Sequence, residues 1–99
     1  MTEMHADYDS SANAVSISLG IPDSAESADQ VHPRAIVALH NGHPVELQLL
    51  YPELGIDEPL AEVTNRYRLD AEALMAAVRA ALAAPDREVT VDVSAPTAA

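Results

Sequence analysis

The chain has 99 residues, the size of a single domain, and 48% of them are hydrophobic although only 3% are aromatic. Sixteen carboxylates against five arginines give a formal net charge of −11, which disfavours nucleic acids and anionic membranes as partners because both attract clustered basic residues. Cysteine is absent, which excludes disulfides, thiolate metal ligands and cysteine nucleophiles. No signal peptide and no apolar run of ~20 residues is visible, so we expect a cytoplasmic protein without a membrane-spanning segment.

Two alternating stretches near the start of the chain predict a β-hairpin. Hydrophobic and polar residues alternate over residues 4–8 and again over 15–19, with the period of two that is typical of half-buried strands. Between them, residues 9–13 (Asp-Ser-Ser-Ala-Asn) are turn formers. The acidic, serine-rich residues 20–30 follow, and we interpret them as a connecting segment.

A second hairpin is predicted over residues 31–51. Two β-type runs flank residues 40–43, His-Asn-Gly-His, and Asn-Gly is the preferred centre of a two-residue type I′ turn. Opposite residues of such a pair point to the same face. Counting outward from the turn therefore places His40 opposite His43, and puts Ile36 on the face that the hairpin buries.

The other face of this hairpin combines apolar and polar side chains. A contiguous apolar patch on so highly charged a protein is typical of an interaction surface. The alternative is that residues 52–69, or the last strand, cover this patch. We predict an interaction face that consists of Val37, Leu39, Leu50 and Tyr51.

The second half of the chain predicts one helix. Residues 52–69 contain two prolines and a glycine, and we interpret them as a long connection with one short helical turn at 60–63. Asp70 is a good N-cap and Pro85 stops the run that follows it. Apolar residues between them recur at helical spacing, which predicts a helix over 71–84.

These elements predict an α+β fold, a small antiparallel β-meander of four to five strands with the single helix packed on one face. Valines that alternate with polar residues over 88–93 indicate the last strand. We expect one domain over residues 1–93 and a disordered tail at residues 94–99.

Four histidines raise the hypothesis of a metal site. His40 and His43 are expected to be cross-strand neighbours with Cβ atoms about 5 Å apart. His5 or a nearby carboxylate could complete a ligand set. The alternative is that His40 and His43 are simply polar residues at the tip of a hairpin.

The sequence contains no motif for catalysis or cofactor binding. It has no P-loop, no GxGxxG, no HExxH and no GxSxG nucleophile elbow. Asp7 and Asp9 are paired carboxylates, but nothing around them predicts a pocket that would raise a pKa, so we interpret them as solvated. We therefore expect a protein that is not an enzyme and needs no cofactor.

Both hairpins resemble a known family. Residues 6–19 resemble the opening "YDxxADALYIxL" of a small bacterial domain family of unknown function, number two-two-eight-three, and residues 36–50 resemble its second element, a strand, a turn and an "xLVGIEIL" strand. The resemblance covers residues 5–51 and implies a β-meander, a bacterial origin and no established activity or catalytic residues. Some family members sit beside toxin-like genes, which implies an antitoxin-like role. Asn13 stands where the family has Asp, and residues 40–43 replace its acidic turn.

We expect a non-catalytic interaction domain that self-associates or binds a basic protein, because a charge of −11 accompanies a mixed sheet face and no site motif. The first alternative is an antitoxin-like inhibitor of a basic partner protein. The second is a metal-binding protein that uses His40 and His43.

Overall fold

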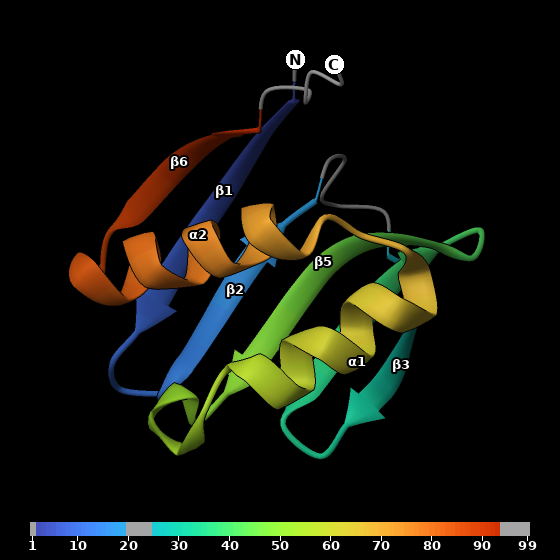
Figure 1. Ribbon diagram of the computed structural model, residues 1–99, viewed down its shortest axis with the longest axis horizontal. Coiled ribbons are helices and arrows are strands. Elements are labelled where there is room, and N and C mark those ends of the chain that lie inside the picture. The colour runs from blue at the N-terminus through green and yellow to red at the C-terminus, as the bar shows by residue number, and fades with distance from the viewer. Residues whose placement is uncertain (1, 20–24, 94–99) are drawn as a thin grey trace.

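The chain forms one antiparallel sheet, and both of its α-helices pack on the same face of that sheet (Figure 1). The computed structural model describes residues 2–19 and 25–93. In this part of the chain the strands are β1 (Thr2–Asp9), β2 (Ala14–Ser18), β3 (Ser27–His32), β4 (Ala35–His40), β5 (His43–Leu50) and β6 (Glu88–Val93). The helical elements are a 3-10 turn η1 (Pro52–Leu54), α1 (Asp57–Tyr67) and α2 (Ala71–Ala83). The predicted tail at 94–99 lies outside the described residues.

The predicted α+β class is confirmed, but the sheet has more strands than expected. Its order is β3-β4-β5-β2-β1-β6, with six strands instead of four or five. The last strand returns to pair with the first, and β5 pairs with β2, so the sheet is not a simple meander. The additional strand is β3. It lies at the edge of the sheet beside β4, so β4 is an internal strand.

The first predicted hairpin is confirmed, and its turn explains the polar run at residues 9–13. The Asp9 carboxylate accepts hydrogen bonds from the backbone N–H groups of Ser11 and Ala12, at 3.0 and 3.3 Å. Asn13 adopts the left-handed conformation with φ 54°, which asparagine tolerates better than most residues. The turn residues therefore fix the chain reversal locally.

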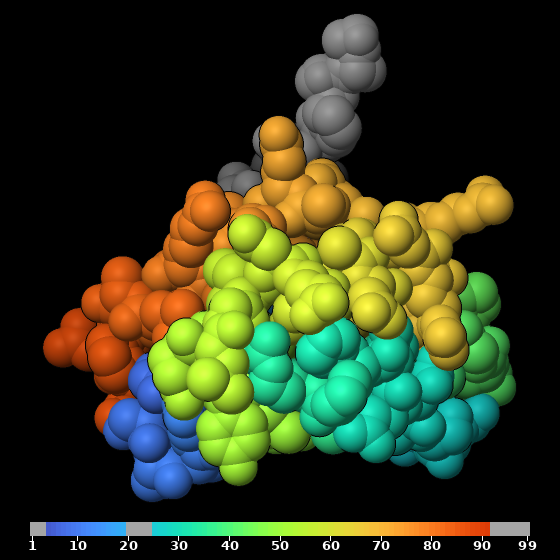
Figure 2. Space-filling view, turned by 60° about the horizontal axis from the view of Figure 1, so that its bottom comes forward, coloured from blue at the N-terminus to red at the C-terminus, as the bar shows by residue number. Residues whose placement is uncertain are grey.

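Strand β3 begins within residues that the sequence indicated as a connecting segment, so that interpretation is wrong for 27–30. None of its residues is fully buried, because β3 is an edge strand, and its sequence therefore lacks hydrophobic alternation. Side-chain hydrogen bonds connect it to α1. Asp29 accepts hydrogen bonds from the Tyr67 hydroxyl at 2.6 Å and from Arg66 at 3.0 Å. Figure 2 shows α1 seated directly against β3.

The second hairpin has the predicted turn but a different register. The turn residues Asn41 and Gly42 both have positive φ, and His40 pairs with His43 as predicted. A bulge beside Ala38 then shifts the pairing by one residue, which exchanges the two faces of β4 relative to the counted register. Pro44 lies at this bulge, and proline cannot donate a hydrogen bond to the strand ladder.

Helix α2 confirms the predicted helix, and α1 corrects the predicted connection. The Asp70 carboxylate accepts a hydrogen bond from the Ala73 N–H at 3.2 Å, as an N-cap does. Residues 57–67 form the full helix α1, where one short turn was predicted, because Leu60 and Val63 bury one side of it against the sheet. The core between the two layers consists mainly of aliphatic residues, led by Ile17, Leu47, Leu49, Leu60, Leu74, Val15, Val37, Val63 and Val78.

Candidate interaction surface

The sheet face opposite the helices is covered by no element of the described chain (Figure 1). The strand registers place its outward residues in two rows that cross all six strands. None of these residues is buried. We call them the open face: Gln30, Ile36, Gln48, Ser16, Asp7 and Glu88 in one row, and Ala28, Ala38, Glu46, Ser18, His5 and Thr90 in the other.

The open face changes in character from one end to the other. On β4 and β5 it has a shallow hollow of about 280 Å³ lined by Ile36, Ala38, Glu46 and Gln48. The middle strand, β2, contributes two small hydroxyl side chains. At the opposite end, a second hollow of about 370 Å³ is lined by Asp7, Asp9, Asp86, Arg87 and Glu88. The face is therefore partly aliphatic at one end and strongly acidic at the other.

Basic residues lie away from the two rows. No strand of the described chain contains an arginine or lysine. The Arg34 guanidinium donates hydrogen bonds to the backbone carbonyls of Tyr51 and Gly55, at 3.0 and 2.9 Å, and Arg66 pairs with Asp29. Arg87 borders the acidic hollow but belongs to neither row. The formal charges within the rows are thus all carboxylates.

The acidic end concentrates negative charge. Partial burial raises the pKa of Asp7, and the carboxylates of Asp9 and Glu88 raise it further. Hydrogen bonds from Ser11 and Ala12 lower the pKa of Asp9 and keep it ionised. Asp7 lies directly opposite Glu88 in the pairing of β1 with β6, so like charges are neighbours here. An approaching cation would relieve this repulsion.

The predicted interaction face does not exist as a single surface, and this prediction is wrong. Val37 is fully buried, and Leu39 packs against the core, because the bulge beside Pro44 turns these residues toward the helices. Leu50 is half-buried and Tyr51, beyond the strand, is 49% exposed. Ile36 and Ala38 take the outward positions instead. The one signal for this exchange in the sequence is Pro44 directly after the turn.

The histidines of the metal hypothesis are only partly brought together. His40 and His43 pair across the hairpin turn, and His40 Nδ1 lies 3.6 Å from Glu26 Oε1. His5 is on β1, three strands away from β4, which is about 14 Å at the usual strand spacing. It therefore cannot complete a site at the turn. Among the described residues, these three histidines belong to no cluster of metal-ligating atoms.

A different cluster does bring potential ligands together, but its hydrogen bonds oppose metal binding. Ligand atoms of His32, Glu58 and Glu62 lie within 4.8 Å of one another. His32 Nδ1 accepts a hydrogen bond from the Arg34 N–H at 3.1 Å, which places the proton of the neutral ring on Nε2, 3.6 Å from Glu58. A metal would need the lone pair of Nε2. We interpret the cluster as a polar tie between β3 and α1, two elements the sequence did not predict.

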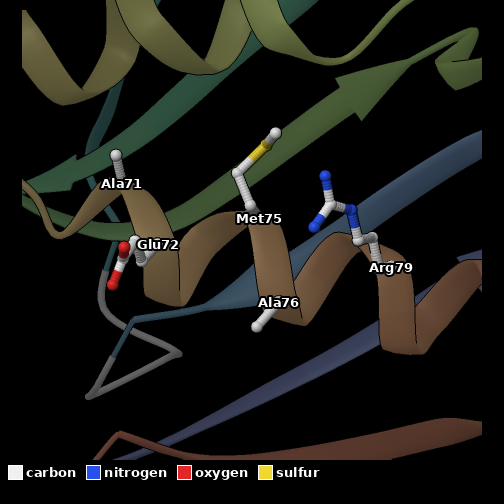
Figure 3. Close-up of a pocket in the computed structure, with 5 residues that line it drawn as sticks. All are labelled: Ala71, Glu72, Met75, Ala76 and Arg79. Carbon is white, nitrogen blue, oxygen red and sulfur yellow. The ribbon is translucent and has the colours of Figure 1, made fainter.

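A further hollow of about 450 Å³ lies along α2 and is lined by Ala71, Glu72, Met75, Ala76 and Arg79. Figure 3 shows that Met75 and Arg79 point to one side of the helix, whereas Glu72 and Ala76 point to the other. The polar groups therefore do not converge on a common point, and this surface lacks the geometry of a ligand site.

Comparison with protein-family models, with curated proteins and with solved structures found no match. The family resemblance of the two hairpins therefore stays a prediction, and the surface has to be interpreted from its own geometry. No helix of the described chain is long and apolar enough to cross a membrane.

Proposed function

We propose that the protein is a non-catalytic binding module whose open face docks a basic partner protein. The observation that carries this proposal is the chemistry of the two rows, which combine Asp7, Glu46 and Glu88 with partly exposed aliphatic side chains and contain no arginine or lysine. A partner that presents arginine or lysine beside apolar residues would complement both ends of this face.

The dimensions of the open face favour a transient complex. Six strands spaced by about 4.8 Å, each about 20 Å long, give the whole sheet a flat area of about 500 Å², and the two rows occupy part of it. Stable complexes usually bury about 800 Å² on each partner. Electrostatic attraction would therefore contribute mainly to the rate of association and to the choice of partner.

A second copy of the chain is a poorer occupant than a basic protein. It would bring another net charge of −11, and no cation in the rows of either copy would neutralise the facing carboxylates. The charge that favours a basic partner thus opposes self-association. An antitoxin-like inhibitor would be one case of the proposed module, with the toxin as the basic partner.

The proposal is tested by capture from the organism that encodes the protein, with two matched variants. Glu46→Lys reverses a charge on the open face, whereas Glu72→Lys makes the same change on α2, in the helical layer. The tagged proteins are incubated with host lysate at low salt, and bound proteins are identified by mass spectrometry. We expect a basic protein that binds wild type and Glu72→Lys and is lost with Glu46→Lys.

Two results would contradict the proposal. The first is a captured partner that both variants retain equally, which would place the binding surface elsewhere. The second is capture of copies of the chain alone, which would favour self-association. Circular dichroism of both variants establishes that each is folded before the comparison is made.

A further inference from the structure

The two edges of the sheet differ in how open they are to another strand. At one edge, β3 has an irregular register between Gln30 and His32 and ends at His32, directly before Pro33. Bulges and prolines are devices by which proteins block the pairing of edge strands. At the other edge, β6 pairs with β1 in six consecutive positions without a shift and contains no proline. By this criterion, β6 is the unprotected edge.

Side chains along β6 divide between the two faces of the sheet. Val89 and Val91 pack against the core on the helix side. Glu88 and Thr90 are exposed at the end of the two open-face rows, and Asp7 lies next to Glu88 on β1. The residues of a strand added beside β6 would also alternate between the two faces. Its apolar residues would extend the core on the helix side, and the residues between them would lie beside the acidic end of the open face.

We infer that the basic partner docks by adding an extended strand to the outer edge of β6, which no other described strand covers, with its basic side chains on the open-face side. This inference rests on the proposed function and specifies how the partner binds. Backbone hydrogen bonds along β6 hold the added strand, and pairing of its basic side chains with Glu88 selects it. A second copy would present the same acidic edge, so self-pairing through β6 is disfavoured while a basic strand is accepted.

A pair of synthetic peptides tests strand addition on the whole protein. The first is a short peptide in which lysines alternate with valine or threonine. The second has the same sequence and charge, but all of its backbone nitrogens are methylated, so it can attract carboxylates and cannot pair as a strand. Affinity is measured by fluorescence anisotropy, and binding is located by amide hydrogen exchange in the ¹⁵N-labelled protein.

We expect the unmodified peptide to bind at least about tenfold more tightly than the methylated one, because several backbone hydrogen bonds are lost together. Amide exchange over residues 88–91 should slow on binding. Glu88→Lys should weaken binding of the unmodified peptide severalfold, whereas the matched change Glu72→Lys on α2 should not.

Equal affinity of the two peptides would overturn strand addition. If slowed exchange then mapped to Ser16 or Gln48 in the middle of the open face, the proposed function would stand with a different docking mode. Failure of both peptides to bind would also overturn strand addition, and the capture experiment with Glu46→Lys would still decide the function by itself.

Discussion

Asp7 and Asp9 lie two residues apart on β1, and the structure shifts their pKa values in opposite directions. Burial is the largest cause for Asp7, whose pKa is raised, with a contribution from like charges nearby. Hydrogen bonds are the cause for Asp9, whose pKa is lowered, and the Ser11 hydroxyl lowers it most. Ionised Asp7 therefore opposes folding at neutral pH, whereas ionised Asp9 favours it.

We expect Asp7→Asn to raise the melting temperature at pH 7 and Asp9→Asn to lower it. The penalty from Asp7 develops as pH rises above its unfolded pKa of about 3.9 and is complete above the raised folded pKa. The contribution of Asp9 is present above about 3.9 and is lost as pH falls through the lowered folded pKa. Thermal unfolding at pH 7 and at about pH 3 checks both signs. Shifts of the same sign at pH 7 would contradict this account.

Strand β4 shows how one bulge in a hairpin decides which side of a strand faces the core. Without the bulge beside Pro44, Ile36 would face the core and Val37 would face outward. With it, Val37 is fully buried and Ile36 lies on the open face. A shift of one residue exchanges every side chain of a strand between the two faces. The register of β4 therefore determines where the aliphatic end of the open face lies.

Adjacent substitutions on β4 test this register. Val37→Glu places a carboxylate in the core and should cost about 3 kcal/mol or more of unfolding free energy, enough to unfold a marginal domain. Ile36→Glu, made on the open face, should change it by less than about 1 kcal/mol. Urea denaturation followed by circular dichroism distinguishes them. Equal destabilisation, or a larger loss of stability from Ile36→Glu than from Val37→Glu, would favour the counted register over the observed one.

Elements with a strong local signal could be predicted from the sequence. Residues 41–42 specify the second hairpin turn, and Asp70 with Pro85 delimits α2 closely. Strand β3 and helix α1 could not be predicted in the same way, since β3 has no fully buried residue and α1 buries only a narrow stripe. Polar contacts of Asp29 with Arg66 and Tyr67 join the two elements across the fold. Contacts of this kind are tertiary, so they do not appear in the hydrophobic periodicity of either segment.

At the scale of the whole molecule, the candidate surface depends on facts that single residues do not reveal. Composition indicated an acidic protein, and that part of the functional hypothesis follows from the sequence alone. The strand order brings residues from all six strands into two rows, with Gln30 at one end and Glu88 at the other. Neither the strand order nor the bulge between β4 and β5 can be predicted from hydrophobic alternation. The site was therefore missed even where its strands were predicted.

The net charge of −11 should make the stability of the fold depend on salt. Repulsion among carboxylates opposes the compact state, and added salt screens it, since the Debye length falls from about 30 Å at 0.01 M to about 8 Å at 0.15 M. We expect the melting temperature at neutral pH to rise over this range of sodium chloride concentration. At about pH 3, where many carboxylates are neutral, the rise should be smaller. A melting temperature that falls with salt at neutral pH would mean that attractive ion pairs dominate.

Strands β1 and β6 are neighbours in the sheet although nearly the whole described chain separates them, with Thr2 opposite Val93. On the ribosome β1 emerges first and β6 last of these elements. One edge of β1 therefore stays unpaired until all the other elements have been synthesised. A nascent chain that ends before residue 88 would present β1, the strand that bears Asp7, as a bare edge. The sheet is complete only once β6 has been translated, and until then β1 is the strand that a chaperone would need to protect.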